Sequence, residues 1–415
     1  MRVCLVSNLY PPPVGGDAEV YVSRLAEALA EDHHVVVIST QPGGHQNPRR
    51  EVADNGVVVY RLAPLNIGGP SNLPRGLIGK AAFRAIDFYH PQVASSVRAI
   101  IARERPDIVH VHNWVGLSLA AVLSSVDGGR FDRVPVAITP HDYSLCCAHG
   151  DLRHPDGTGC PPGRGCRALS AVNRRLTGSV GMVISPSRYA LAAHQQRGFF
   201  ARAQTAVLPY GLAAATPVAG RTRPKEKQTH DVLFLGEAKR HSGAELLVRA
   251  FRALTEPSLR LKLAGYGPLP AEWRRLAEGD PRVSFHADLS RQARQALLDA
   301  ADCLVVPTSW PENCPLSILE AFQSGAVVIA SRIGGIPETV SDGINGLLVE
   351  PGDEAAIGAA IERLRLNPQL HTRLRAEAHE TAPLFDMAFH ASHVAEAYRR
   401  LLSAGRTSPL TGQAA

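Results

Sequence analysis

The sequence predicts an α/β protein of two doubly wound domains, each a mainly parallel sheet with helices on both faces. Three observations favour this class. The 415 residues exceed what one hydrophobic core usually supports. Short β-branched runs alternate with helical stretches in both halves. A stretch without periodicity, Ala213 to Gln228, separates the halves, so we expect the domain boundary there.

Composition indicates a folded protein of a reducing compartment. Apolar residues make up 45% of the chain and charged residues 20%, which is ordinary for a globular protein. There is no run of eighteen apolar residues, and the apolar stretch after Met1 is too short for the core of a signal peptide. We therefore expect a cytoplasmic protein. Three isolated cysteines fit a reducing compartment better than a disulfide framework: Cys4, Cys303 and Cys314.

The formal charge of +6 is weak evidence for an anionic partner, because the arginines are scattered. There is no groove-reading helix and no interleaving of aromatic and basic residues, so nucleic-acid binding is not expected. Residues 71–105 carry Lys80 and several arginines among apolar side chains. A solvated helix face over a buried stripe is the preferred interpretation there, with peripheral contact to an anionic membrane as the alternative.

The first half is predicted to open as strand, loop and helix. Val3–Val6 is a buried strand, Pro11–Gly16 excludes regular structure, and Glu19–Ala30 is a helix with one apolar stripe. A β-branched run follows at Val35–Ile38, which completes a strand-helix-strand unit. Further strands are expected at 57–60, 108–112, 134–139 and 182–185, and a helix at 92–103.

The second half repeats this order. A strand at Val232–Leu235 ends at Gly236 and is followed by a polar loop and a helix from Gly243. In two such domains, the cleft between them is the expected ligand site. Strands are expected at 261–264, 283–285, 303–306 and 327–329, and the residues after Gly405 are expected to fray.

A helix is predicted to begin in the segment after the strand 303–306. Pro315 suits the first helical turn and Gly325 the position just past its end. The backbone N–H groups from about Cys314 to Ser317 would then have no partner within the helix. Such a helix start is a ready anion site, and a diphosphate is the anion we expect.

Two carboxylates flank this helix start in the chain. Glu312 lies in the loop before it and Glu320 lies within the helix, so both can border one ligand and accept hydrogen bonds from hydroxyl groups. Carboxylates repel phosphate, so we expect the two glutamates to serve the sugar and ribose ends of the ligand.

Glu312 and Glu320, with seven residues between them, belong to an ordered set of motifs that resembles the signature of the GT4 family of retaining glycosyltransferases, which have the GT-B fold. The set spans nearly the whole chain: Gly15-Gly16, His141-Asp142, Ser185-Pro186-Ser187, Ala264 to Pro268, Ala330 to Glu338, Asn345 to Val349 and the helix around Tyr398.

The resemblance implies two facing Rossmann-like domains with a cleft between them. Residues 1–208 would form the acceptor-side domain and residues 209–385 the nucleotide-sugar domain. Residues 386–404 would be a helix that crosses back to the first domain, and residues 405–415 a flexible tail.

The resemblance also implies roles for single residues. Glu312 and His141 would act on the transferred sugar, and Glu320 would bind the ribose. Retaining transfer in this family implies no protein nucleophile, no metal and no cofactor. The other donor-binding residues would be Gly15, Gly16, Gly236, Asn313, Cys314, Pro315 and Leu316.

One departure from the family pattern concerns the cations that neutralise the diphosphate. Counting from Gly236, the usual Arg and Lys positions hold Glu237 and Ser242. A carboxylate beside a diphosphate is repulsive, so either Lys239 or Arg240 replaces the missing cations or donor binding is weak or unusual.

Two histidines, His110 and His112, alternate along the strand 108–112. We expect one to lie in the core and one to face the cleft, and we place neither in the site.

Four cysteines after His141 leave alternatives open, with His149 and His154 beside them. A structural zinc site is one, although adjacent cysteines seldom bind one ion comfortably. A disulfide is another, and a flexible acceptor-side loop is preferred. The cysteines are Cys146, Cys147, Cys160 and Cys166.

We therefore expect a metal-independent, retaining hexosyltransferase that uses a nucleoside-diphosphate sugar, with UDP as the favoured nucleotide. The acceptor is a small molecule, a glycan or a lipid-linked intermediate. The alternatives are a nucleotide-sugar epimerase of the same fold, and a non-catalytic member that binds a ligand or a partner protein.

Overall fold

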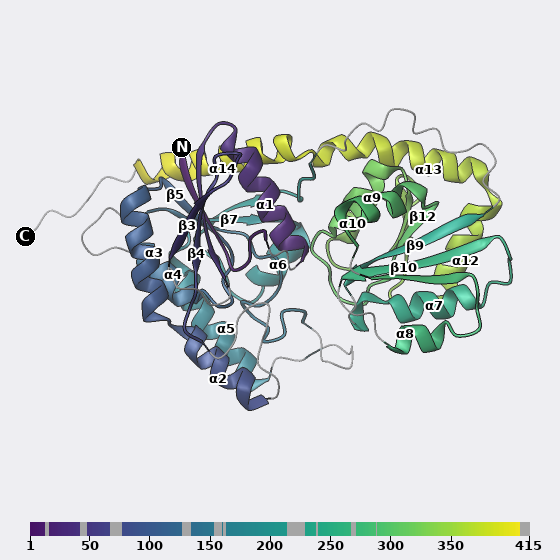
Figure 1. Cartoon of the computed structure of the whole chain (residues 1–415), viewed down its shortest axis with the longest axis horizontal. Helices are drawn as coiled ribbons and strands as arrows, with labels where there is room; N and C mark the ends of the chain where they lie inside the picture. Colours follow the sequence, from purple (N-terminus) through teal and green to yellow (C-terminus); the bar gives the residue numbers. More distant parts are fainter. Residues whose placement is uncertain are drawn as a thin grey trace, which may run out of the picture. The chain divides into compact units, whose positions relative to one another are not determined.

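The computed structural model describes residues 1–12, 16–41, 48–66, 77–126, 134–152, 160, 163–213, 229–237, 240–266, 271–287 and 289–406. The chain forms two compact units (Figure 1). The N-terminal unit comprises Met1–Gly150, Pro162–Gly211 and Met387–Ala415, and the C-terminal unit comprises Asp151–Pro161 and Leu212–Asp386. Most of the expected linker and the expected tail, residues 214–228 and 407–415, lie outside the described residues.

The N-terminal unit contains an eight-stranded sheet in the order β3-β4-β2-β1-β5-β6-β7-β8. Every neighbouring pair is parallel except β3 and β4, which are antiparallel. The strands are β1 (Arg2–Ser7), β2 (His34–Thr40), β3 (Arg49–Val52), β4 (Val58–Leu62), β5 (Ile108–Asn113), β6 (Val136–Ile138), β7 (Met182–Ser185) and β8 (Gln204–Val207).

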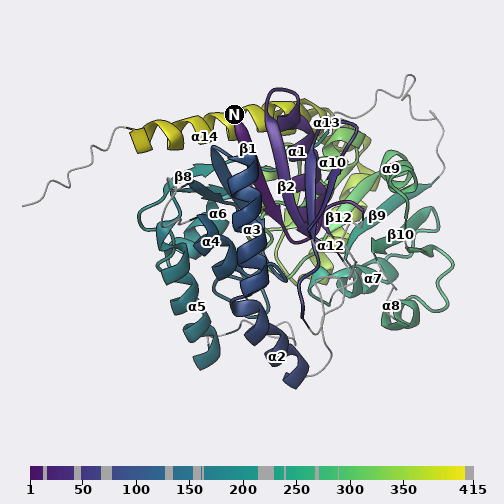
Figure 2. The same ribbon diagram turned by 60° about the vertical axis from the view of Figure 1, so that its left-hand side comes forward.

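Helices cover both faces of this sheet (Figure 2). On one face α1 (Asp17–Ala30) packs against α14 (Met387–Arg406), and on the other α3 (Pro91–Glu104) packs against α4 (Leu119–Val126). The apolar stripe of α1 is buried as its spacing predicts, because it lies against the sheet. The remaining helices are α2 (Leu77–Phe88), α5 (Arg164–Leu176) and α6 (Arg188–Gln195).

The C-terminal unit contains a six-stranded, fully parallel sheet in the order β11-β10-β9-β12-β13-β14. Buried apolar side chains of its strands and helices form one core. The strands are β9 (His230–Glu237), β10 (Leu259–Tyr266), β11 (Val283–Ala287), β12 (Cys303–Val306), β13 (Val327–Ser331) and β14 (Gly346–Val349).

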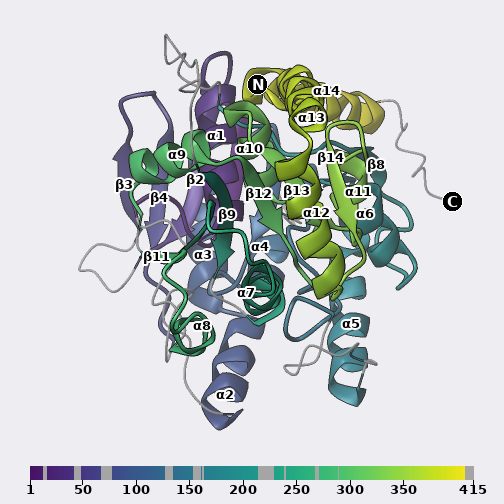
Figure 3. The same cartoon turned by 90° about the vertical axis from the view of Figure 1, so that its right-hand side faces the viewer.

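Helices lie on both faces of this sheet as well (Figure 3). One face carries α7 (Ala244–Arg252), α8 (Ala271–Leu276) and α12 (Glu354–Leu366). The other carries α9 (Arg291–Ala300), α10 (Leu316–Ser324) and α13 (Pro368–Thr381). A short helix, α11 (Ile336–Thr339), follows β13.

The predicted fold class is confirmed: both units are Rossmann-like, as in the GT-B fold. Every predicted strand forms, and several extend by one or two residues. The prediction missed the strands β3 and β8, at the two edges of the N-terminal sheet, and β14, at one edge of the C-terminal sheet. β3 and β8 are short and polar, as edge strands often are, so they lack the apolar run that marks an interior strand. β14 is also short, and its residues appeared only as part of the motif Asn345 to Val349.

In each sheet the winding reverses once. From β1 the chain proceeds toward β2, and from β5 it proceeds toward β6 on the opposite side, so the reversal lies between the neighbouring strands β1 and β5. In the C-terminal sheet the reversal lies between β9 and β12. Loops diverge on either side of such a reversal, so ligands of doubly wound sheets bind there, beyond the carboxyl ends of the strands.

At the reversal between β9 and β12 the two loops touch. Gly243, the N-cap of α7, has a φ of +81°, and a Cβ atom there would collide with the carbonyl oxygen of Pro307. Only glycine fits this position, because the obstructing atom belongs to the backbone.

We expect Gly243→Ala to destabilise the protein far more than Gly279→Ala. Gly279 has a φ of +80° but no atom within 4 Å of an added Cβ, so it is a matched control for backbone strain alone. The control substitution should lower the free energy of unfolding by about 1–2 kcal/mol. Gly243→Ala should lower it by more than about 3 kcal/mol. Thermal unfolding of both variants measures the difference, and equal losses would contradict the close contact with Pro307.

Candidate active site

In the C-terminal unit the loops after β9, β12 and β13 are joined backbone to backbone. The carbonyl oxygen of His241 accepts a hydrogen bond from the amide of Ser309 at 2.9 Å, and that of Glu312 accepts one from the amide of Gly335 at 2.7 Å. Gly334 has a φ of +62°, and a Cβ atom there would collide with the Glu312 carbonyl oxygen. The segment after β12 is therefore held from both sides.

From Pro311 to Glu320 this segment is buried except at two glutamates. Glu312 and Glu320 are partly exposed, whereas the residues 313–319 between them are buried. The helix α10 begins at Leu316, and Pro315 is its extended N-cap, one position before the first turn in which it was expected. The first amides of the helix have no partner within it, so its N-terminus can bind an anion.

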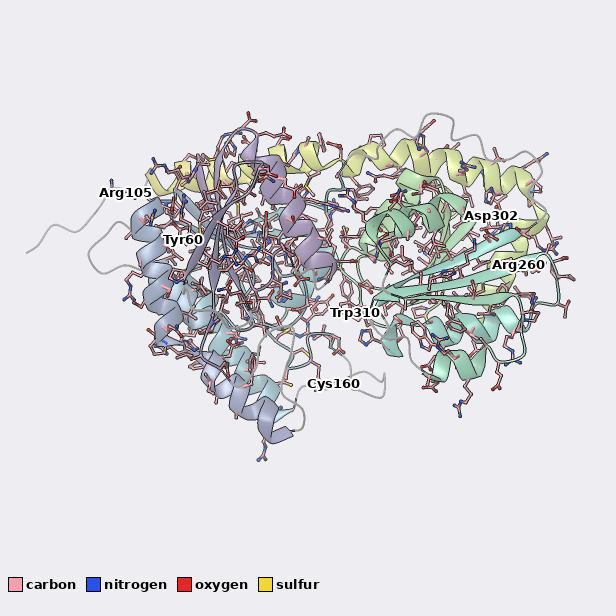
Figure 4. The ribbon with its side chains drawn as sticks, viewed as in Figure 1. Tyr60, Arg105, Cys160, Arg260, Asp302 and Trp310 are labelled. Carbon is pink, nitrogen blue, oxygen red and sulfur yellow. The ribbon has the colours of Figure 1, made fainter. Side chains whose placement is uncertain are left out.

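Trp310 contacts Glu312 directly. Its indole N–H donates a hydrogen bond to Oε1 of Glu312 at 2.5 Å, and its ring centroid lies 5.6 Å from that of His241. Figure 4 labels Trp310 near one end of the C-terminal sheet and Asp302 and Arg260 toward the other. Sequence reasoning missed this contact, since the only signal was a tryptophan two residues before the glutamate.

The residues expected to replace the missing cations are only partly described. Lys239 lies outside the described residues, and Arg240 lies in a short 3-10 helix, Arg240–Ser242, with its side chain undescribed. Gly236 and Glu237 end strand β9, where they pair with Gly265 and Tyr266 of β10.

In the N-terminal unit, Gly16 follows β1 at the reversal of winding and is the N-cap of α1. Gly15 lies outside the described residues. Glu19, in the first turn of α1, is buried and accepts a hydrogen bond from the side chain of Asn113 at 3.2 Å. Burial raises the pKa of the Glu19 carboxyl. An added Cβ at Gly16 would lie 3.3 Å from that carboxyl, so the loop is closely packed here.

His141 follows β6 and has a hydrogen-bond partner at each ring nitrogen. Its Nε2 lies 3.1 Å from Nδ1 of His112, and its Nδ1 lies 2.5 Å from the hydroxyl of Tyr210. Burial lowers the pKa of His141 to about 3, so the ring is neutral at ordinary pH. The site residue predicted from the sequence is therefore fixed by two residues that the prediction left out.

His110 and His112 do not divide between core and cleft as expected. Both are fully buried, with ring centroids 4.0 Å apart. The prediction was wrong because residues two apart on a strand point to the same face. His110 contacts the hydroxyls of Tyr398 at 2.7 Å and Thr139 at 2.8 Å.

These residues form a histidine–tyrosine cluster. The hydroxyl of Tyr21 lies 2.8 Å from Nε2 of His390, and its ring packs against His112, His141 and Tyr210. The cluster joins α1, β5, the loop after β6 and α14, and it comprises His110, His112, His141, His390, Tyr21, Tyr210 and Tyr398.

The positions of the ring protons of His112 and His141 follow from the surroundings of Nε2 of His112. Among the described residues, Nε2 of His112 is buried with no hydrogen-bond partner. An orphaned N–H is rarer than a bare acceptor, so we assign the proton of His112 to Nδ1. That N–H donates to Nε2 of His141, whose own proton then lies on Nδ1 and is donated to Tyr210.

The cysteines show no sign of a metal site in the described part of the chain, where no group of three or more potential metal ligands occurs. None of the four is joined in a disulfide in that part of the chain. Cys146 and Cys147 are buried, and burial raises the pKa of Cys146 to about 11. His154 lies outside the described residues.

No helix in the described ranges combines the length and the apolar character needed to cross a membrane. The side chains of Lys80 and Arg84, in the basic stretch, are not among those described.

Two family models match the chain. A "Glycosyl transferase 4-like domain" matches residues 16–211, and "Glycosyl transferases group 1" matches residues 229–367. One match falls mainly in each unit, and together the two matches cover most of the chain. The chain therefore belongs to the GT4 family of glycosyltransferases, which have the GT-B fold and use nucleotide-sugar donors.

A relative of full length supports this assignment, and two solved structures share the fold. Glycogen synthase of Mycobacterium tuberculosis is 28% identical over 414 residues, covering 96% of this chain and 94% of its own. Sucrose-phosphate synthase of Thermosynechococcus elongatus has a similar structure, with a TM-score of 0.76, 23% identity, and coverage of 97% and 99%. Anabaena HepE, crystallised with UDP-glucose, gives a TM-score of 0.68 at 18% identity, covering 96% and 100%.

The neutral histidines make stability depend on pH. Burial lowers the pKa of His110 to about 3 and that of His390 to about 4, against about 6.5 in an unfolded chain. Between about pH 4 and 6.5 the unfolded chain binds protons that the folded chain does not, so stability falls as the pH decreases. We expect the melting temperature to be level from about pH 8 to 7 and to drop by several degrees between about pH 6.5 and 5.

Two variants test the origin of this decline. His390→Gln removes one buried imidazole while keeping a polar partner for Tyr21, so its decline should be shallower. His379→Gln changes an exposed residue of α13 and should leave the decline unchanged. Calorimetry that finds the same pH dependence in His390→Gln as in the natural protein would contradict a neutral imidazole at this position.

Proposed function

We propose that the protein is a retaining hexosyltransferase that moves a sugar from UDP to an acceptor hydroxyl without a metal ion. The burial of the segment after β12 and its contacts with neighbouring loops support the proposal. Within residues 311–320, Glu312 and Glu320 are the two partly exposed positions, and neighbouring loops fix this stretch where the winding reverses. The UDP-glucose bound to the structurally similar HepE supports UDP as the nucleotide.

The donor would lie against the N-terminus of α10. The amides of Asn313, Cys314 and Leu316 would hold the sugar and the phosphates, since a helix start favours negative charge. Glu312 would accept hydroxyl hydrogen bonds from the sugar, and Glu320 would accept them from the ribose. Other donor-binding residues in this unit would be Gly236, Pro315, Lys239 and Arg240.

The N-terminal unit would supply His141 together with Gly15 and Gly16. A neutral His141 adds no charge next to the sugar, and its fixed ring would position the reacting groups. Transfer would depend on stabilising the departing diphosphate, without a protein nucleophile.

We assign the acceptor to the N-terminal unit and the donor to the C-terminal unit. The acceptor class is a small molecule, a glycan or a lipid-linked intermediate. We place the protein in a reducing compartment such as the cytoplasm, because Cys4, Cys303 and Cys314 are isolated in the sequence.

A non-catalytic member of the family is the second candidate, and Glu237 is the observation that favours it. This residue ends β9 at the reversal of winding, where a carboxylate would repel a diphosphate. Incubation with UDP-sugars and acceptor extracts separates the candidates by mass spectrometry. Sugar transfer supports the proposed enzyme, whereas UDP binding without turnover supports the second candidate.

The two glutamates should affect different steps. Glu320→Gln should weaken UDP binding about ten- to a hundred-fold, because a hydrogen bond to a charged group contributes about 1.5–3 kcal/mol. Glu312→Gln should mainly lower kcat. Calorimetry and steady-state kinetics measure the two effects, with Glu377→Gln on the exposed face of α13 as the control. Negligible effects of both substitutions would refute this donor site.

Transfer should continue in the presence of a chelator. A mechanism that stabilises the diphosphate with backbone amides and side-chain cations needs no divalent ion. Initial rates would be compared after treatment with EDTA and after addition of Mg²⁺ or Mn²⁺. A rate that depends on the added ion would overturn the metal-independent mechanism.

A further inference from the structure

The carboxylate of Glu320 is held by an arginine from the neighbouring helix. Arg294 of α9 donates two hydrogen bonds to one oxygen of Glu320, from Nη2 at 2.6 Å and from Nε at 3.0 Å, and both end at Oε2. The two side chains are only 11% and 14% exposed. Exposed ion pairs contribute little, but this pair is largely removed from water, so its geometry is well defined.

The local sequence places Arg294 toward α10. Ser290 caps α9 by accepting a hydrogen bond from the amide of Ala293 at 3.1 Å, which sets where the helix begins. Leu298, four residues after Arg294, is the deeply buried residue of α9, and residues four apart share a helix face. Arg294 is therefore on the inward side of α9.

A second contact fixes the two helices against each other. The side-chain amide of Gln295 donates to the hydroxyl of Ser324 at 2.9 Å and to Asp299 at 2.8 Å. The contact of α9 with α10 therefore does not depend on Arg294 alone.

We propose that Arg294 is a positioning residue of the nucleotide site, which holds Glu320 by Oε2 so that the carboxylate can accept hydrogen bonds from the ribose of a nucleoside diphosphate. The positive charge also offsets repulsion between Glu320 and the diphosphate. This inference rests on the proposed role of Glu320.

The test compares UDP with 2′,3′-dideoxy-UDP, which lacks both ribose hydroxyls. The natural protein should prefer UDP at least about ten-fold. Arg294→Gln should weaken UDP binding about ten-fold and dideoxy-UDP binding much less, so that the preference falls toward one. Arg294→Lys should restore part of the preference, because it keeps the charge but not the planar geometry. Arg291→Gln, at an exposed position of the same helix, is the control.

The outcomes separate this inference from the proposed function. If Glu320→Gln removes the preference for UDP and Arg294→Gln leaves it intact, Arg294 has no positioning role. If Arg294→Gln weakens both nucleotides equally, its effect is not on ribose recognition and the inference fails. If the natural protein and Glu320→Gln bind both nucleotides alike, the proposed role of Glu320 itself is wrong, and the inference fails with it.

Discussion

The candidate donor site depends on one contact, in which Gly243 packs against the carbonyl of Pro307. Strands β9 and β12 are neighbours whose following helices lie on opposite faces of the sheet, so their loops must separate. The absence of a side chain at Gly243 lets these loops meet, and a hydrogen bond from the amide of Ser309 to the carbonyl of His241 joins them. A further hydrogen bond, from the amide of Gly335 to the carbonyl of Glu312, joins the loop after β12 to the loop after β13. Backbone contacts thereby make the segment that carries the two glutamates rigid.

In the N-terminal unit, side chains rather than backbone contacts fix the candidate site residue, His141. Its histidine–tyrosine cluster links elements that are far apart in the chain, through hydrogen bonds of neutral rings. Burial of the imidazoles is tolerable because each is uncharged and most ring nitrogens have partners. The orientation of His141 is thus determined by the interior of the unit.

Electrostatics distinguishes the candidate residues of the two units. In the C-terminal unit, carboxylates lie on either side of the helix start at which a diphosphate is proposed to bind, so opposing positive charge is required there. The helix start of α10 and Arg294 provide part of it. In the N-terminal unit the candidate residue His141 is a neutral imidazole.

The sequence by itself determined the fold class and indicated the segment after β12 as a candidate donor site, because hydrophobic periodicity and turn residues are local signals. It placed Glu312, Glu320 and His141 but missed His112 and Arg294. These two act through partners that are distant in the chain, and no local pattern encodes which side chains meet across a sheet or between helices. The tertiary structure alone decided those contacts, since burial and hydrogen bonding select them only after the chain has folded.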